Sequence, residues 1–179
     1  LVIGAGPVGC MLAMLAKALG ASKTILADIS SERLNASKVA DANHYFNSID
    51  SAAFEESVLN ATNGEGVDVV FTACPSPEAQ EASTRLLRNK GTVNFFGGLP
   101  QGSKKISLDS NALHYRELTV TGSHGSVPRQ HAQAVELISS KKIDVGKLVS
   151  KTYPLDEINS AFADLRDKKI LKAVIKPWR

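Results

Sequence analysis

A six-residue segment near the start of the sequence, GAGPVG at positions 4–9, constrains the fold more than any other. The run LVI before it is apolar, as a buried strand is, and an apolar helical pattern begins at Pro7 and stops at Gly20. Glycine at the sixth position of the segment, Gly9, lets a helix lie close to the preceding strand. The segment therefore predicts a strand and a helix joined by a tight glycine-rich turn.

The same turn has the spacing G-x-G-x-x-G, which is typical of dinucleotide-binding proteins. Gly4 permits the sharp turn, and Gly6 allows the backbone to approach a pyrophosphate group. The exposed amides of the helix N-terminus then face the phosphates. A tight turn that binds nothing is the alternative interpretation of these glycines.

Asp28 ends the next apolar run, KTILAD, about 20 residues after the glycine-rich turn. A carboxylate there accepts hydrogen bonds from the adenosine ribose hydroxyls and repels a 2′-phosphate, which favours NAD over NADP. Arg33 is close in sequence, and it would either offset this repulsion or stack on adenine. Alternatively, Asp28 is only a cap for the helix predicted at residues 31–40.

Apolar runs and helical patterns alternate through the first 122 residues. Strands are predicted at residues 1–3, 23–28, 44–47, 67–74, 92–96 and 118–122, and helices at 7–19, 31–40 (after Ser30 or Ser31), after Asp50, and at 75–88. Strands that alternate with helices indicate an α/β protein with a parallel sheet covered on both faces. Six strands in this rhythm predict a doubly wound, Rossmann-type sheet in the order 3-2-1-4-5-6.

After Gly122 the pattern changes to helices at 128–140 and 156–168, the second capped by Asp156, and a last strand at 170–175. We therefore divide the chain into a nucleotide-binding domain, residues 1–124, and a C-terminal segment, residues 125–179. The strand at 118–122 is expected at the edge of the sheet, where its unpaired backbone groups invite pairing with a second copy. We accordingly expect a homodimer or a tetramer.

Composition excludes several classes of protein. Of the 179 residues 43 % are hydrophobic and 22 % charged, enough to bury a core, and the net charge of +3 favours neither nucleic acid nor an anionic membrane as a partner. The uncharged stretch 1–16 lacks a basic flank and is interrupted by glycines, so we expect neither a signal peptide nor a membrane span, and a cytoplasmic protein. The two cysteines make no disulfide framework, and no two of the four histidines are spaced i, i+4 as metal ligands on a helix.

Four segments together resemble the medium-chain, zinc-dependent alcohol dehydrogenase family over essentially all 179 residues. They are VIGAGPVG, VDVVFTAC with the following Pro75, GTVNFFGGLP, and LVSKTYPLDEINSAFADLRDKKILKAVIKP. Within the family, FGGLPQGSKKISLDSNALHYRELTVTGS is most similar to bacterial polyol dehydrogenases of the sorbitol or iditol type. Threonine-type and sugar-phosphate dehydrogenases have similar cofactor domains.

The resemblance implies which residues contact the cofactor NAD. The end of the fourth strand would touch the nicotinamide, the loop after the fifth strand would hold its carboxamide through backbone groups, and Lys172 would reach the pyrophosphate. The candidate cofactor-binding residues are Gly4, Gly6, Pro7, Val8, Gly9, Asp28, Ile29, Arg33, Ala73, Cys74, Phe96, Gly97, Gly98, Ser123 and Lys172. Cys74 has no base near it in sequence. We therefore interpret it as a small apolar residue at the end of the strand rather than as a nucleophile.

The family's zinc ligands and proton-relay hydroxyl belong to a catalytic domain that has no counterpart in these residues. The sequence starts inside an apolar run without an initiator Met, so we expect a piece of a longer protein whose C-terminal segment returns to that domain. The resemblance implies that the whole enzyme oxidises a secondary alcohol or polyol by hydride transfer to NAD, with zinc in the other part. We expect no catalytic and no metal-binding residue in this chain, and no activity from it alone.

Three alternatives remain open at this point. One is a zinc-free quinone or enone reductase of the same superfamily, against which Asp28 counts because such enzymes usually prefer NADP. Another is a stand-alone nucleotide-sensing domain. A methyltransferase, which also has glycines after its first strand, is disfavoured by the spacing of GAGPVG and by the C-terminal segment.

Overall fold

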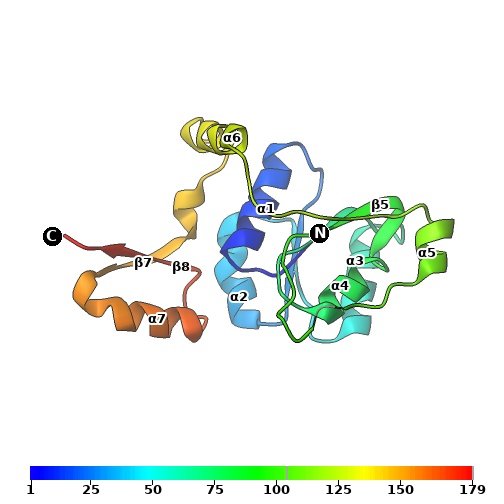
Figure 1. Ribbon diagram of the computed structural model, residues 1–179, viewed down its shortest axis with the longest axis horizontal. Coiled ribbons are helices and arrows are strands. Elements are labelled where there is room, and N and C mark those ends of the chain that lie inside the picture. The colour runs from blue at the N-terminus through cyan, green and yellow to red at the C-terminus, as the bar shows by residue number, and fades with distance from the viewer. Residues whose placement is uncertain (104, 179) are drawn as a thin grey trace.

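The computed structural model describes residues 1–103 and 105–178. At its centre is a parallel sheet of six strands in the order β3-β2-β1-β4-β5-β6 (Figure 1). The strands are β1 (Val2–Ile3), β2 (Ile25–Asp28), β3 (His44–Asn47), β4 (Val67–Thr72), β5 (Leu87–Phe95) and β6 (Thr119–Gly122). The predicted doubly wound fold and its strand order are confirmed.

Helices cover both faces of this sheet. They are α1 (Pro7–Ala18), α2 (Ser31–Ala36) with the 3₁₀ turn η1 (Ser37–Ala40), α3 (Ser51–Ala61), α4 (Pro77–Ser83) and α5 (Ser110–Tyr115). Successive strand residues point to opposite faces, and Val2 and Ile3 accordingly belong to two different core clusters. Val2 packs with Cys10 of α1, whereas Ile3 packs with Phe54 of α3. A strand apolar on both faces therefore places α1 and α3 on opposite sides.

Side-chain caps explain where several helices begin. The Ser30 hydroxyl accepts a hydrogen bond from the amide of Arg33, and the Asp50 carboxylate accepts from Ala52 and Ala53. The predicted cap at Asp50 is confirmed, and Ser30 rather than Ser31 caps α2. The predicted cap at Asp156 is wrong.

The helix predicted at residues 75–88 is too long, and the strand predicted at 92–96 begins too late. Helix α4 ends at Ser83, and β5 already begins at Leu87. Leu86 and Leu87 are only 1 % exposed, and Leu87 pairs with Val67 across an irregular register. Burial of these two side chains against β4 outweighs the local helical pattern.

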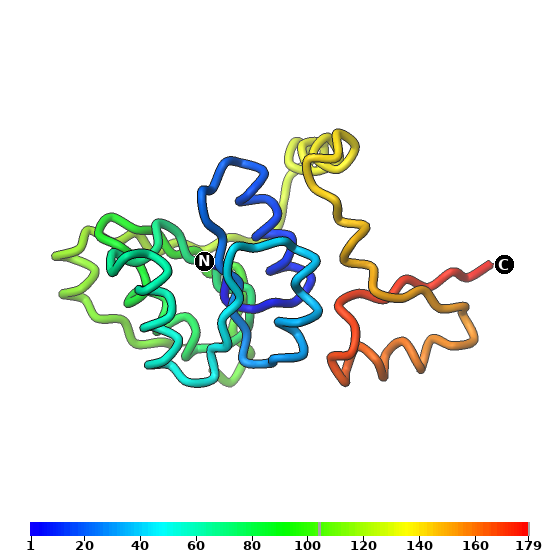
Figure 2. Tube along the Cα trace, turned by 180° about the vertical axis from the view of Figure 1, so that it is seen from behind, coloured from blue at the N-terminus to red at the C-terminus, as the bar shows by residue number. Residues whose placement is uncertain are grey.

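A small C-terminal lobe follows the sheet at one end of the molecule (Figures 1 and 2). It contains α6 (Pro128–Ser139), η2 (Val145–Leu148), β7 (Val149–Pro154), η3 (Leu155–Glu157), α7 (Ile158–Arg166) and β8 (Lys172–Lys176), and β7 pairs parallel with β8. Sequence analysis missed β7 and α5. It also overlooked η3, which is why Asp156 is not the cap: α7 starts only after Glu157.

Tyr153 lies at the centre of this lobe and is only 1 % exposed. Its hydroxyl donates to Asp164 Oδ2 at 2.5 Å, and the Lys151 ammonium lies 4.5 Å from its ring centre. Burial raises the pKa of the Tyr153 phenol, and the hydrogen bond from Tyr153 lowers the pKa of Asp164. The lobe thus has a small core of its own.

Two leucines attach the lobe to the part of the chain that forms the six-stranded sheet. Leu148 and Leu171 are buried in the core cluster that contains Val2 and Cys10. The domain boundary at residue 124 stays a prediction. Within residues 1–103 and 105–178, no helix combines the length and the apolarity needed to cross a membrane.

Candidate nucleotide-binding site

The glycine-rich turn lies where β1 ends, and two of its glycines are required by the packing. Gly4 has φ +111°, and a Cβ atom there would lie 2.9 Å from the carbonyl oxygen of Ala73. A Cβ atom at Gly9 would overlap the carbonyl oxygen of Gly4. These two positions bring β1, α1 and the end of β4 into close contact, as the spacing predicts.

Gly6 differs, because a Cβ atom at this position would meet nothing within 4 Å. Its own conformation, φ −74°, is open to any residue, so folding does not require glycine here. The first hydrogen bond of α1 runs from Cys10 N to Gly6 O, and Pro7 has no amide proton. The amides of Val8 and Gly9 therefore come before the first hydrogen bond of the helix and have no acceptor within it. Open space beside such amides fits an anionic group.

Asp28, at the end of β2, is 7 % exposed and accepts two backbone hydrogen bonds. Its Oδ2 accepts from Ala5 N at 2.8 Å, and its Oδ1 accepts from Ser30 N at 2.9 Å. Ser30 is the N-cap of α2, so the interpretation of Asp28 as that cap is wrong. Each carboxylate oxygen keeps a further acceptor position, which suits two ribose hydroxyls.

Two side chains next to Asp28 are available to an adenosine group. Ile29 is 62 % exposed although it follows a buried strand. Arg33 is partly exposed and lies in the first turn of α2. An exposed isoleucine and a guanidinium group are both surfaces on which a purine ring packs.

The ends of β4 and β5 are held together tightly by backbone contacts. Gly97 N donates to Thr72 O at 2.7 Å, and a Cβ atom at Gly97 would lie 2.6 Å from the carbonyl oxygen of Cys74. The side chain of Gln80 donates to Gly97 O at 2.9 Å. Ala73 N donates to Ile3 O at 2.7 Å and joins this corner to β1.

Cys74 is half-buried at this corner, and burial raises the pKa of its thiol. The neutral thiol is the form that burial favours, and it is a poor nucleophile. The structure therefore favours the interpretation of Cys74 as a small residue at the strand end over its interpretation as a nucleophile.

Phe96, Gly98 and Ser123 lie beyond this corner, at the ends of β5 and β6. Phe96 is 45 % exposed, and Ser123 is held by a 3.0 Å hydrogen bond from its hydroxyl to Asn94 Oδ1. Phe96 and Ser123 line a groove of about 820 Å³ between α1 and α6. Gly98 is exposed, and a Cβ atom there would meet nothing within 4 Å.

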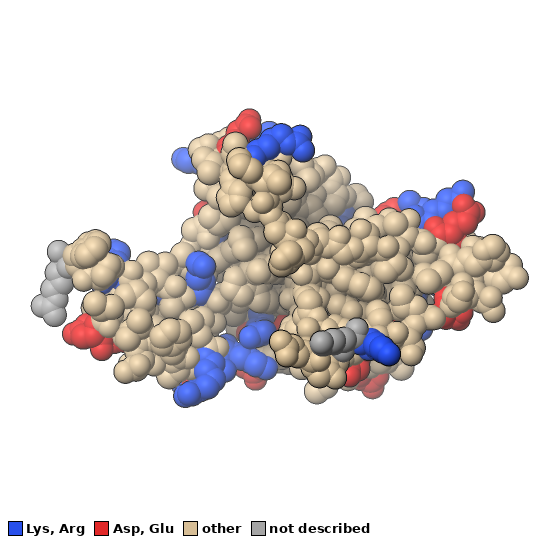
Figure 3. Space-filling model, viewed as in Figure 1, with Lys and Arg blue, Asp and Glu red and all other residues tan. Residues whose placement is uncertain are grey.

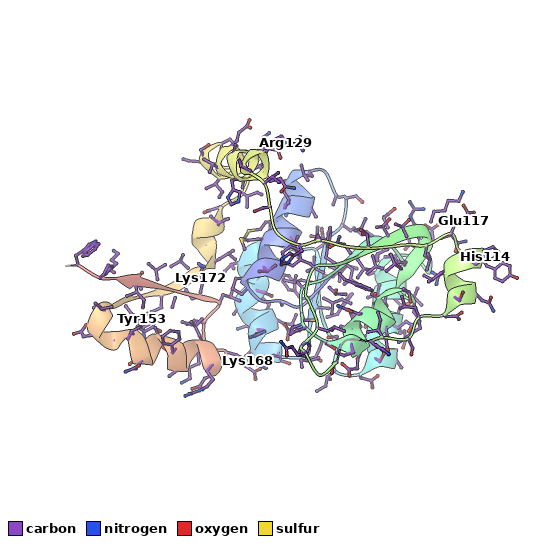
Figure 4. All side chains as sticks on the ribbon, in the orientation of Figure 1. His114, Glu117, Arg129, Tyr153, Lys168 and Lys172 are labelled. Carbon is purple, nitrogen blue, oxygen red and sulfur yellow. The ribbon has the colours of Figure 1, made fainter. Side chains whose placement is uncertain are left out.

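Lys172 comes from the other end of the chain and is the first residue of β8. The preceding Leu171 is buried with Ala5 of the glycine-rich turn and with Leu34 of α2. Figure 4 shows Lys172 at the end of β8 nearest to α2. The C-terminal lobe thus brings a lysine to the neighbourhood of the turn.

Comparison with known proteins identifies the family of the chain. The family model for zinc-binding dehydrogenases matches residues 7–140. The chain belongs to this family of zinc-dependent alcohol and polyol dehydrogenases. D-xylulose reductase A of Aspergillus niger is 33 % identical over 177 residues, which are 97 % of this chain and 49 % of the relative.

Solved structures of the dehydrogenase family have the same fold. Benzyl alcohol dehydrogenase of Acinetobacter calcoaceticus superposes with a TM-score of 0.86 at 31 % identity, over 98 % of this chain and 48 % of that protein. A protein of Sinorhizobium meliloti described as a zinc-binding dehydrogenase, and bound to NADP, has a TM-score of 0.82 at 26 % identity, over 98 % of this chain and 51 % of its own. The chain therefore spans about half the length of the dehydrogenases that it matches.

A zinc site does not fit the part of the chain that the structure describes. No group of three histidine, cysteine, aspartate or glutamate side chains there is arranged to hold a metal ion. Three of the four histidines have other contacts: His44 stacks on Phe46, His114 meets Tyr115 edge-on, and His131 shares a 2.7 Å hydrogen bond with Ser126.

Sequence analysis missed Gln80, whose side chain fixes the loop after β5 through its hydrogen bond to Gly97 O. Gln80 belongs to no motif, because it contributes a polar group to a neighbour that only folding brings close. Ser30, whose amide donates to Asp28 two residues away, had a local signal in the N-capping pattern, which indicated Ser30 or Ser31.

Proposed function

We propose that this chain is the nucleotide-binding part of a dehydrogenase that transfers hydride between a secondary alcohol, of the polyol class, and NAD. One observation carries the proposal: Gly6 leaves open space beside free helix amides, and the Asp28 carboxylate lies across the turn from it, bonded to Ala5. This arrangement suits a dinucleotide with a free 2′-hydroxyl. The polyol class is supported by the similarity to D-xylulose reductase A.

The chain's own residues bind and orient the dinucleotide in this proposal. The amides of Val8 and Gly9 face the pyrophosphate with help from Lys172, and Asp28 accepts the ribose hydroxyls. The backbone of Phe96 and Gly97 holds the carboxamide. Nicotinamide, when bound, supplies the hydride acceptor, and the protein supplies position and orientation.

The alternatives make different predictions about binding and catalysis. A quinone or enone reductase of the same superfamily would prefer NADPH, which the Asp28 carboxylate disfavours. A nucleotide-sensing domain would bind NADH but would not be part of an enzyme that oxidises an alcohol. An assay of binding and of turnover therefore tests the proposal.

The 179-residue chain is expected to bind NADH tighter than NADPH in a fluorescence titration, because Asp28 repels a 2′-phosphate. It is expected not to reduce NAD with sorbitol, because the described residues contain no zinc ligand set and zinc must lower the pKa of the alcohol. Equal or tighter binding of NADPH would contradict the cofactor assignment. Sorbitol-dependent NAD reduction, or stoichiometric zinc in the chelator-washed chain, would contradict the proposal that this part of the enzyme binds the cofactor and that another part holds the zinc.

We further propose that two copies pair through β6, which is the edge strand of the sheet. All four residues of β6 are exposed, and Val120 is 36 % exposed. Val120→Pro removes a backbone donor, so it is expected to convert a dimer into the 19 kDa monomer in sedimentation experiments. Val120→Thr, which keeps the donor, is the matched control and is expected to leave the dimer intact. A monomeric unmodified chain at micromolar concentration would refute pairing.

A further inference from the structure

The turn between α7 and β8 carries a lysine to the adenosine end of the proposed site. Lys168 has φ +58°, a left-handed conformation that reverses the chain after α7. Three residues later, Leu171 is 6 % exposed and packs in the cluster that contains Ala5 and Leu34. Leu171 N is also held by Ser150 Oγ at 3.0 Å. Because Leu171 is anchored beside α2, the turn that precedes it lies near the start of that helix (Figure 4).

The charge of Lys168 reaches the first turn of α2. The pKa of Glu32 is lowered mainly by the hydrogen bond from the Ser30 hydroxyl, and the Lys168 ammonium acts in the same direction. Figure 3 shows basic side chains gathered where the α7–β8 turn meets α2. A residue of the C-terminal lobe therefore adds positive charge near the first turn of α2.

Four charged side chains lie at or near the start of α2, which is the adenosine end of the proposed site. Asp28 and Glu32 are negative, whereas Arg33 and Lys168 are positive, so the sum is zero. Both oxygens of Asp28 already accept backbone amides, which disperse its charge. Within residues 1–103 and 105–178, neither Arg33 nor Lys168 forms an ion pair with a carboxylate. Both cations are available to an additional anion.

We propose that Lys168 is a cofactor-selectivity residue: its ammonium group, together with the guanidinium of Arg33, receives the 2′-phosphate of NADPH, so that the chain binds NADPH as well as NADH. The inference rests on the proposed function and extends it. Asp28 sets the preference for NADH, and Lys168 limits that preference. The two cations offset the repulsion that a 2′-phosphate meets from the carboxylates of Asp28 and Glu32.

Titration of NADH and NADPH against the chain and against Lys168→Gly tests this inference. Glycine adopts positive φ readily, so this variant removes the charge without straining the turn. We expect the affinity for NADPH to fall about tenfold and the affinity for NADH to change less than about twofold. Lys168→Arg, which keeps the charge, is expected to retain most of the NADPH affinity.

Lys169→Ala is the matched control. Its ammonium lies 3.2 Å from Asp167 and 3.8 Å from Asp164, within the C-terminal lobe, so its removal is expected to affect neither cofactor. An equal loss of NADH and NADPH affinity in Lys168→Gly, or no loss of either, would overturn the inference. If the unmodified chain binds NADH but not NADPH, the inference fails and the proposed function stands. If it binds neither, both fail.

Discussion

Gly9→Ala is expected to unfold the nucleotide-binding domain or to destabilise it severely. A Cβ atom at this position would occupy the place of the Gly4 carbonyl oxygen. Gly4 cannot move away easily, because its amide donates to Ala27 O at 2.7 Å and its φ is +111°. Overpacking that forces backbone to shift costs about 1–3 kcal/mol and occasionally more, and an overlap with backbone oxygen belongs at the upper end. Urea denaturation followed by circular dichroism measures the loss.

Gly6→Ala is the matched control for that substitution, in the same turn. Because a Cβ atom at Gly6 has open space and an ordinary φ, the free energy of unfolding is expected to change by less than about 0.5 kcal/mol. NADH binding is expected to fall at least tenfold, since the methyl group takes the space of the pyrophosphate. A Gly6→Ala chain that binds NADH normally would show that this turn does not hold phosphate. A stable Gly9→Ala chain would contradict the packing of α1 on β1.

Asp28→Ser is expected to change both cofactor selectivity and stability. The variant loses charge-assisted hydrogen bonds to the ribose, each worth about 1.5–3 kcal/mol, so NADH affinity is expected to fall tenfold or more. NADPH affinity is expected to fall much less, because repulsion of the 2′-phosphate disappears at the same time. The unfolding free energy is expected to decrease as well, by about 1–3 kcal/mol for each amide, of Ala5 or Ser30, that is left without an acceptor.

Asp28→Asn separates the two effects, because it removes the charge and keeps one oxygen acceptor. We expect its stability to lie between those of the parent and Asp28→Ser, and its NADH-to-NADPH affinity ratio to be close to that of Asp28→Ser. Titrations are made well below the melting temperature of each variant. A ratio unchanged from the parent in both variants would show that Asp28 serves only the fold.

Local patterns in the sequence were enough to predict the sheet and the tight turn that follows its first strand. The alternation of strands with helices led to the strand order, because each pattern reflects burial on a known period. The structural need for Gly4 and Gly9 was predicted because a tight turn needs glycine at particular spacings. These features depend on residues that are close together in sequence, so the local sequence is enough to predict them.

Only the tertiary structure decided the features that depend on distant neighbours. Leu87 became a strand residue because it is buried beside Val67, although its local pattern is helical. Gln80 reached Gly97, and Leu171 came to pack with Leu34 of α2, through contacts between segments far apart in sequence. Such partners carry no local signal, because the free energy that favours them comes from burial and hydrogen bonds that exist only after the sheet and the lobe have packed together.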